Sequence, residues 1–321
     1  MIYSNDFQEY EAARQIHRVL IMHYLEGLKQ SEIAKLLDLS TAKVNRLIKE
    51  GRKSGMVEIN IKTPFQPLID VEARLIETGG ISEAMVTPTV SENPDVVLNT
   101  VGEAAASFLL ENLKDGDTIC ITGGKGVGAV VDALNPERAY DVEVVPATGC
   151  VQGKHYTDVN HVATLMAEKL GGRAYQIHAP LFAETKDQKE MLMSMKSVEE
   201  VLDRARNATI AIVGVGSILS GDSSYYDLHP MAKDDRNEIQ KSGATGELLA
   251  HLFDENGELC KYELNSRLVA LSPKEFSKVP LTIGVASGEN KIAPIRAMLR
   301  GNHLKALVVD EATATAVLDD L

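Results

Sequence analysis

A glycine-rich turn, Gly123-Gly124-Lys125-Gly126, lies between a predicted strand and a predicted helix. Glycine lets a ligand approach the backbone closely, and the N–H groups and dipole at a helix N-terminus favour an anion. Lys125 adds a positive charge. The turn lacks the Gly-Lys-Ser/Thr of a P-loop, and its glycine spacing fails the dinucleotide-binding pattern. The residue types therefore indicate either a site for an anion such as a phosphate or a purely structural turn.

Three other predicted strands are also followed by glycine, by lysine or by residues with a side-chain hydroxyl. Gly216 follows one of them, and Lys291 begins a helix after another. Glu247 lies in a separate glycine-rich turn, where its carboxylate could accept hydrogen bonds from sugar hydroxyls or cap a helix. The candidate ligand-binding residues are Gly123, Gly124, Lys125, Gly126, Thr148, Gly149, Gly216, Glu247 and Lys291.

The elements that must position these residues are strands that alternate with helices. Short β-branched runs separated by helical patterns predict a parallel sheet with helices on both faces. Ligands of such sheets bind at the carboxyl ends of the strands, so the four polar strand ends should converge on one cleft. The predicted strands cover residues 84–87, 118–122, 142–146, 175–178, 209–215, 281–286 and 306–310.

Spacing gives no sign of a catalytic residue, a cofactor or a metal. His155 and His161 lie near Asp158, but their separation does not suit ligation from one helix. The three cysteines are far apart and form no C-x-x-C pair, which fits a reducing cytoplasm. The N-terminus lacks a secretory pattern, and no run approaches the roughly 18 to 20 apolar residues needed to span a bilayer. We expect a soluble, cytoplasmic protein.

Residues 29–55 predict two helices separated by a tight break. Ser40 is a suitable N-cap for the second helix, in which Val44, Leu47 and Ile48 form an apolar stripe. This is the layout of a helix-turn-helix whose second helix recognises DNA, although an ordinary pair of helices has the same apolar spacing.

Charge favours DNA binding. Residues 29–62 contain eight Lys and Arg against four Asp and Glu, whereas the whole chain has a net charge of -13. A basic helix pair on an acidic protein is the pattern expected of phosphate contact. Lys43, Asn45 and Arg46 are candidates for base edges, and Lys49, Arg52 and Lys53 for phosphates. The full set of candidate DNA-binding residues is Ser40, Thr41, Lys43, Asn45, Arg46, Lys49, Arg52 and Lys53.

The flanking sequence suggests three regions. A helix over residues 7–26 precedes the basic pair, and alternating residues 56–62 predict a strand that makes the unit winged. Two prolines in residues 63–67 mark a linker. The amphipathic helix that follows either packs on its own domain or joins two copies as a dimer seam. We expect a DNA-binding domain at 1–62, a linker and possible dimerisation helix at 63–80, and a ligand-binding domain at 81–321.

Five segments in order resemble the SorC-type sugar-responsive bacterial transcription regulators: LKQSEIAKLLDLSTAKVNRLIKEGRKSGMVEI, ITGGKGVGAV, IAIVGVGSILS, SGATGELLAHLFDENGEL and IGVASGENKIAPIRAMLRGNHLKALVVDEATATAVL. The resemblance implies a winged helix-turn-helix followed by a doubly wound, mostly parallel α/β domain similar to phosphosugar isomerases and deaminases. It also implies a phosphorylated sugar or polyol as effector, operator DNA as partner and a homo-oligomer, expected to be a tetramer.

The same resemblance assigns roles to individual residues. The glycine-rich turn that contains Lys125 corresponds to the family's phosphate loop, Thr148 lies on a second ligand strand, and Glu247 and Lys291 match polar ligand contacts. Glu247 stands where the family often has aspartate. The competing hypothesis is a phosphosugar isomerase or deaminase with an N-terminal oligomerisation arm, in which Glu247 or Asp222 would be the general base.

Overall fold

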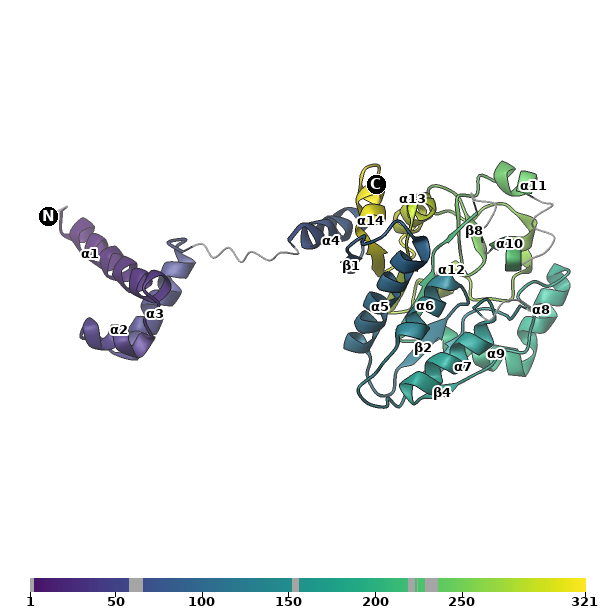
Figure 1. Ribbon diagram of the computed structural model, residues 1–321, viewed down its shortest axis with the longest axis horizontal. Coiled ribbons are helices and arrows are strands. Elements are labelled where there is room, and N and C mark those ends of the chain that lie inside the picture. The colour runs from purple at the N-terminus through teal and green to yellow at the C-terminus, as the bar shows by residue number, and fades with distance from the viewer. Residues whose placement is uncertain (1–2, 58–65, 152–155, 219–222, 224, 229–235) are drawn as a thin grey trace. The chain divides into compact units, whose positions relative to one another are not determined.

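In the computed structural model the chain forms two compact units, Met1–Pro64 and Phe65–Leu321 (Figure 1). The structure describes residues 3–57, 66–151, 156–218, 223, 225–228 and 236–321. The helix that follows the predicted linker belongs to the larger unit.

Within its described residues, 3–57, the N-terminal unit is an assembly of three α-helices. Its elements are α1 (Tyr3–Leu20) with a short π-helix η1 (Ile21–Leu25), α2 (Gln30–Leu36) and α3 (Thr41–Lys53). Both α1 and α2 pack on α3, because apolar side chains at helical spacing from all three helices share one small core. The core residues are Ile16, Val19, Leu20, Ile33, Ala34, Val44, Leu47 and Ile48.

The break between α2 and α3 is set by local chemistry. Asp38 has a φ of 54°, a left-handed conformation that ends α2. Ser40 then caps α3, since its Oγ accepts a hydrogen bond of 3.1 Å from the N–H of Lys43. The predicted helix-turn-helix is confirmed. Of the predicted wing strand, Met56 and Val57 lie outside regular structure, and residues 58–62 lie outside the described residues.

The larger unit is built on a seven-stranded parallel sheet in the order β1-β10-β9-β5-β2-β3-β4. This doubly wound α/β architecture confirms the predicted fold class. A second, three-stranded antiparallel sheet contains β6 (Gly216–Ser217), β7 (Gly246–Leu248) and β8 (His251–Phe253). The strands of the main sheet are β1 (Glu83–Thr87), β2 (Thr118–Ile121), β3 (Glu143–Pro146), β4 (Arg173–Ala174), β5 (Ile210–Gly214), β9 (Leu281–Ala286) and β10 (Ala306–Asp310).

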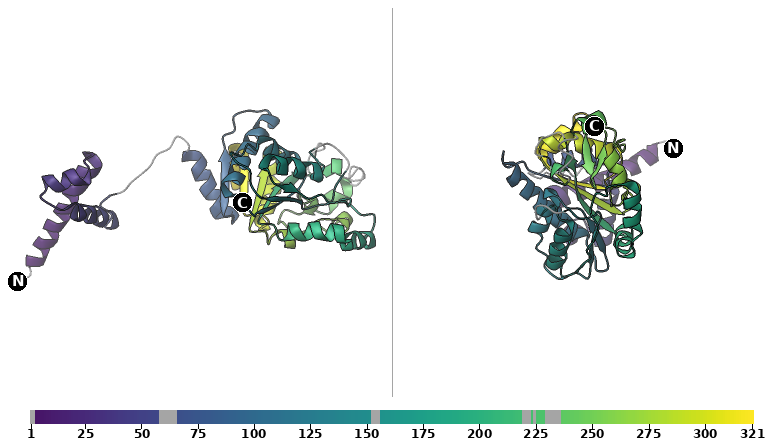
Figure 2. Two further views of the ribbon diagram at one scale, coloured as in Figure 1. Left: turned by 90° about the horizontal axis from the view of Figure 1, so that it is seen from below. Right: turned by 90° about the vertical axis from the view of Figure 1, so that its right-hand side faces the viewer.

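Helices cover both faces of the main sheet (Figure 2). Helices α5 (Pro94–Asn112), α6 (Lys125–Ala133) and α7 (Val159–Leu170) connect strands that progress in one direction along the sheet, whereas α9 (Lys196–Arg206) and α13 (Ile292–Arg300) connect strands that progress in the other. Because such crossovers are right-handed, the two groups of helices lie on opposite faces. The helices of this unit are α4 (Gln66–Gly79), α5 (Pro94–Asn112), α6 (Lys125–Ala133), α7 (Val159–Leu170), α8 (Lys186–Ser194), α9 (Lys196–Arg206), α10 (Tyr225–Leu228), α11 (Arg236–Lys241), α12 (Pro273–Phe276), α13 (Ile292–Arg300) and α14 (Glu311–Leu318), with 3-10 turns η3 (Glu263–Arg267) and η4 (Glu289–Lys291).

One predicted strand, at residues 175–178, is wrong. The sheet pairing of β4 ends at Ala174, although the N–H of Tyr175 still donates to Val144 O at 2.9 Å. Asn160 then binds the backbone of Ile177, accepting from its N–H at 2.9 Å and donating to its carbonyl at 2.9 Å. The side-chain amide of Asn160 therefore forms the hydrogen bonds to the backbone N–H and carbonyl of Ile177 that a neighbouring strand would otherwise form.

Helix α4 packs on β1, α13 and α14 through the fully buried Leu75. Its Glu72 accepts a hydrogen bond of 2.8 Å from the N–H of Val86, which shields a donor on edge strand β1. Ile69, on the outer surface of α4, is 45% exposed. The helix thus packs on its own unit and keeps an outward apolar residue.

Candidate functional site

The main sheet has one topological switch point, between β2 and β5. From β2 the chain continues through β3 to β4 on one side, and from β5 it continues through β9 to β10 on the other. The loops after β2 and β5 therefore separate and leave a crevice at their carboxyl ends. A cavity of about 520 Å³ opens there, within the range of roughly 300 to 1,000 Å³ typical of small-molecule sites.

All of the candidate ligand-binding residues predicted from the sequence line this cavity. They come from the turns after β2, β3 and β9, from the start of α6 and from the small antiparallel sheet: Gly123, Gly124, Lys125, Gly126, Thr148, Gly149, Gly216, Glu247 and Lys291. Residues separated by up to 168 positions in the chain, Gly123 and Lys291, therefore line the same cavity. Their roles in binding a ligand stay predictions.

The turn after β2 presents a helix N-terminus to the cavity. Gly124 has a φ of 129°, which side-chain-bearing residues rarely adopt, and α6 begins at the next residue. The first N–H groups of a helix have no partner within the helix, so the start of α6 offers donors and the positive end of a dipole. Lys125 is exposed at this position, where its amine can reach an anion.

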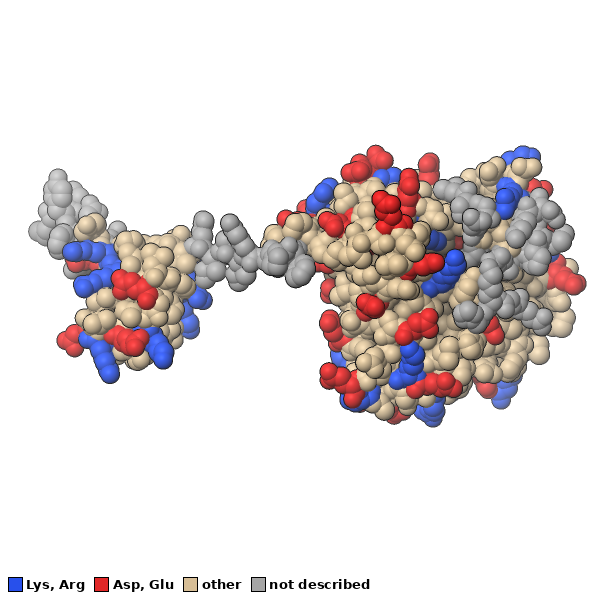
Figure 3. All heavy atoms as spheres, viewed as in Figure 1, with Lys and Arg blue, Asp and Glu red and all other residues tan. Residues whose placement is uncertain are grey.

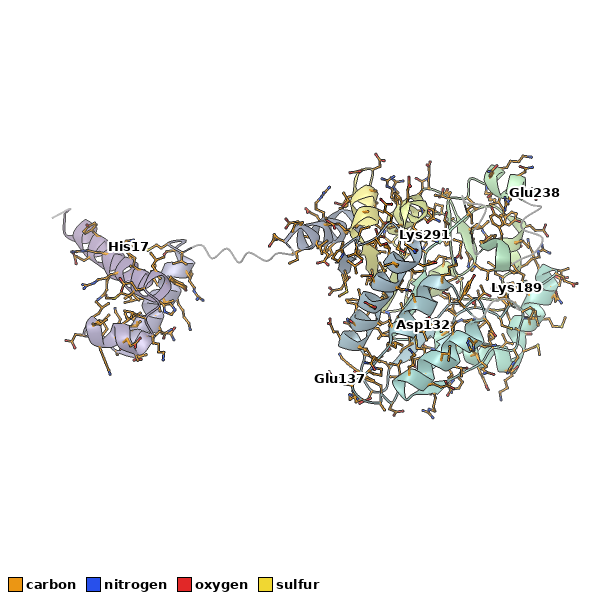
Figure 4. All side chains as sticks on the ribbon, in the orientation of Figure 1. His17, Asp132, Glu137, Lys189, Glu238 and Lys291 are labelled. Atoms are coloured by element: carbon orange, nitrogen blue, oxygen red, sulfur yellow. The ribbon has the colours of Figure 1, made fainter. Side chains whose placement is uncertain are left out.

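Lys291 and Glu247 form the charged centre of the cavity. Both are half-buried. Burial lowers the pKa of Lys291, the charge of Glu247 opposes that shift, and the nearby Lys125 lowers the pKa further. Burial raises the pKa of Glu247, opposed by Lys291 and by the N–H of Ala250, which donates to Glu247 Oε2 at 3.0 Å. In Figure 4, Lys291 lies well inside the outline of the larger unit, whereas Glu238 lies at its edge.

The backbone of Gly216 fixes where the Glu247 carboxylate lies. These two residues are paired across β6 and β7, and a Cβ on Gly216 would lie 2.0 Å from Glu247 Oε1 and 2.3 Å from its Cγ. Only glycine leaves room for the acidic side chain in this position.

Replacing Gly216 by alanine should therefore displace the Glu247 side chain and lower the free energy of unfolding by about 1 to 3 kcal/mol. Gly214 is the matched control, since a Cβ there meets nothing within 4 Å. Gly214→Ala should change the unfolding free energy by no more than about 0.5 kcal/mol. Denaturant unfolding of both variants measures the difference, and equal midpoints would contradict the proposed packing.

Several lining residues were not predicted. Asp95 and Leu98 reach the cavity from the start of α5, and Leu181, Leu228 and Leu249 make part of its wall apolar. Asp95 could have been found, because α5 follows the carboxyl end of β1 and the strand-end rule applies there too. Leu181, Leu228 and Leu249 have no such signal in the sequence, since they come from loops and a short helix whose positions depend on long-range packing.

Helix α3 presents most of the predicted DNA-binding residues on its surface. Asn45, Arg46, Lys49 and Lys53 are exposed and lie opposite the buried stripe of Val44, Leu47, Ile48 and Gly51. Ser40 and Thr41 are exposed at its N-terminus, where the Ser40 hydroxyl accepts the capping bond. Figure 3 shows Lys and Arg prominent on the visible face of this unit, whereas acidic side chains are spread over that of the larger unit.

Two of the candidates are more constrained than predicted. Lys43 is half-buried, beside the apolar stripe. Arg52 donates from Nε to the hydroxyl of Tyr24 at 2.5 Å, and its guanidinium lies 5.6 Å from the Tyr24 ring centroid. Tyr24 belongs to the π-helix after α1, so Arg52 is held on the flank of α3. If Arg52 contacts a DNA phosphate, it does so from the position in which Tyr24 holds it.

Within the described ranges, no three His, Cys, Asp or Glu side chains gather in a way that could hold a metal ion. No helix in the described part of the chain is long and apolar enough to cross a membrane. Asp222, the alternative general base, lies outside the described residues.

A helix-turn-helix joined to an α/β unit with a polar strand-end cavity defines the class of ligand-responsive DNA-binding regulators. Residues 63–319 match the family described as "Putative sugar-binding domain", and residues 16–54 match "Sigma-70, region 4". The chain belongs to the SorC-type family of sugar-binding transcriptional regulators.

Named relatives extend over almost the whole chain. The erythritol catabolism regulatory protein EryD of Brucella abortus is 30% identical over 303 residues, covering 94% of this chain and 95% of EryD. The transcriptional regulator LsrR of Escherichia coli is 28% identical over 307 residues, covering 95% of this chain and 94% of LsrR. The full-length sorbitol operon regulator SorC of Klebsiella pneumoniae has the same fold, with a TM-score of 0.74 at 22% identity over 95% of this chain and 98% of that chain.

These relatives are transcriptional regulators, and none of those named is an enzyme. The chain is accordingly a DNA-binding transcriptional regulator with a sugar-binding domain. The alternative, a phosphosugar isomerase or deaminase with an oligomerisation arm, is not supported.

Proposed function

We propose that the cavity binds a phosphorylated sugar or polyol and that this effector controls DNA binding by the N-terminal unit. The observation that carries the proposal is the pair of lysines beside the start of α6. Both lysines line the cavity, and they are close enough for the charge of Lys125 to lower the pKa of Lys291. Two ammonium groups beside a helix N-terminus suit a phosphate.

The remaining cavity wall suits the hydroxylated part of such a ligand. Glu247 can accept hydrogen bonds from hydroxyl groups, and Thr148, Ser217 and Ser287 supply further polar groups. The names of EryD and SorC mention the polyols erythritol and sorbitol, and another relative, the deoxyribonucleoside regulator of Bacillus subtilis, is named for compounds that contain a sugar. The two lysines are the reason for proposing that the ligand also carries a phosphate.

Phosphorylated and plain compounds compared in pairs test the proposal. Thermal shift and calorimetry should compare erythritol 4-phosphate, sorbitol 6-phosphate and deoxyribose 5-phosphate with erythritol, sorbitol and deoxyribose. At least one phosphorylated compound should raise the melting temperature more than its parent does. Equal responses to both members of every pair would contradict a phosphate site. Operator binding with and without the compound that gives the largest shift then measures how strongly the effector controls DNA binding.

The control we propose is a population shift in a homo-oligomer, expected to be a tetramer. A single recognition helix contacts few base pairs, so useful specificity needs several DNA-binding units at a defined spacing. An effector that prefers one arrangement of subunits would favour one spacing. Light scattering of the free protein and of its DNA complex tests the oligomeric state.

Binding of a phosphorylated effector should be accompanied by proton uptake at alkaline pH. In the protein without effector, burial lowers the pKa of Lys291, and a phosphate beside the ammonium would raise it again. Above about pH 7 the phosphate is already a dianion, so affinity should fall as pH rises through the lowered pKa of Lys291. Calorimetry in buffers of different ionisation enthalpy measures the uptake.

Lys291→Arg is the control for this prediction. The guanidinium stays protonated throughout the accessible range, so the variant should lose the proton uptake while it keeps its positive charge. Uptake that is unchanged in Lys291→Arg would assign the titration to another group.

A further inference from the structure

Asp310 lies at the carboxyl end of β10 and is 2% exposed. Its two oxygens accept hydrogen bonds from three different segments. Oδ1 accepts from the Gly288 N–H at 3.2 Å and from Thr313 Oγ1 at 2.7 Å. Oδ2 accepts from Thr89 Oγ1 at 3.1 Å and from the Thr313 N–H at 3.1 Å. Asp310 therefore ties the loop after β1 and the turn after β9 to the start of α14.

The turn after β9 carries Lys291 to the cavity. Its residues 287–291 all line the cavity. The N–H of Gly288 is shared between Asp310 and Thr313 Oγ1, the latter at 2.9 Å, and its carbonyl accepts from the N–H of Lys291 at 2.9 Å. The position of Lys291 is thus fixed, through one peptide turn, by the carboxylate of Asp310.

The same turn is joined to the two helices on which α4 packs. Helix α13 begins directly after Lys291, and α14 begins directly after Asp310. Arg296 of α13 donates to the carbonyls of Val317 at 3.0 Å and Ala316 at 2.5 Å, so the two helices are also tied to each other. Helix α4 packs on both, and a Cβ on its Gly79 would lie 3.2 Å from Leu299 of α13.

Helix α4 is the first element of the larger unit after the predicted linker. We propose that Asp310 is a positioning residue that couples the Lys291 turn of the cavity to α4. Through this coupling, binding of an effector in the cavity would change the stability of α4, the helix that follows the linker. The regulatory part rests on the proposed function of the cavity. The coupling itself is a property of the protein without ligand. Coupling between sites is carried by hydrogen-bond networks and packed helices, and the contacts from Asp310 through α13 and α14 to α4 form such a connection.

Hydrogen–deuterium exchange of the full-length protein without ligand tests the coupling. Asp310→Asn keeps the size of the side chain, but its NH₂ group cannot accept, so one of the two backbone N–H groups that donate to Asp310 loses this acceptor. Exchange in the turn 287–291 and in α4 should rise together, by about tenfold or more, whereas exchange in the remote α7 should not change. Asp319→Asn, the same substitution at an exposed site beyond α14, should match the wild type.

Three results overturn the proposal: faster exchange in the turn with an unchanged α4, an equal rise in α7, or wild-type exchange throughout in Asp310→Asn. If that variant does not fold, Thr313→Val decides in the same way, because it removes a hydroxyl that donates to Asp310 and accepts from Gly288 while keeping the side-chain shape.

A second arm adds sorbitol 6-phosphate or inorganic phosphate to the wild type. Protection of the turn and of α4 is expected from the sugar phosphate. If neither probe protects the turn, and erythritol 4-phosphate and deoxyribose 5-phosphate also fail to protect it, the proposed function of the cavity fails, whereas the experiment without ligand still decides whether Asp310 couples the turn to α4.

Discussion

Lys291→Met is expected to weaken binding of a phosphorylated sugar or polyol by roughly 10- to 100-fold, the value of a lost charge-assisted hydrogen bond. Lys291 is half-buried, so solvent screens its charge less than it screens the charge of the exposed Lys125. Lys125→Met should therefore have the smaller effect. Calorimetric titration with the compound selected by the thermal-shift comparison measures both losses.

The controls separate binding from stability. Lys278→Met removes an exposed lysine from the same unit and should leave affinity unchanged. In Lys291→Met the Glu247 carboxylate loses a positive neighbour, so its pKa should rise further and the protein should lose stability at neutral pH. Adding Glu247→Gln should recover stability without recovering affinity for the phosphate. A full recovery of affinity in the double variant would show that Lys291 acts only as a partner of Glu247.

The sequence predicted the main sheet because its strands are β-branched runs buried on both faces, a pattern that does not depend on distant residues. The cavity was predicted for a related reason. Parallel strands put their carboxyl ends at one edge, so residues as far apart as Gly123 and Lys291 meet without any specific contact being known.

Other features depend on side chains that meet only in the folded chain. Asn160 replaces the sheet ladder at Ile177, and nothing in the predicted strand at 175–178 signals it. The bond between Thr89 and Asp310 spans 221 residues. Tyr24 holds Arg52 from a π-helix that the helical pattern alone could not distinguish from an α-helix. Such contacts are set by packing, so local patterns cannot give them.

Arg46→Ala and Lys53→Ala should weaken DNA binding in different ways. Arg46 lies in the middle of the exposed face of α3, where a guanidinium can form two hydrogen bonds to a base edge. Its loss should lower the preference for operator over random DNA by roughly 10- to 100-fold. Lys53 lies in the last turn of α3, whereas a recognition helix contacts base edges from its N-terminal part, so we expect Lys53 to contact a phosphate. Its loss should weaken binding to all sequences and lower the salt slope by about 1.

Binding of operator and random duplexes at several salt concentrations measures both effects. Lys35→Ala removes an exposed lysine from α2 of the same unit and serves as the control for charge alone. If Arg46→Ala weakens operator and random DNA equally, Arg46 contacts the backbone and not a base. If Lys53→Ala changes neither affinity nor salt slope, this end of α3 does not contact DNA. Because the homo-oligomer proposed above would use several copies of α3, each loss should be larger for a duplex with two half-sites than for one half-site.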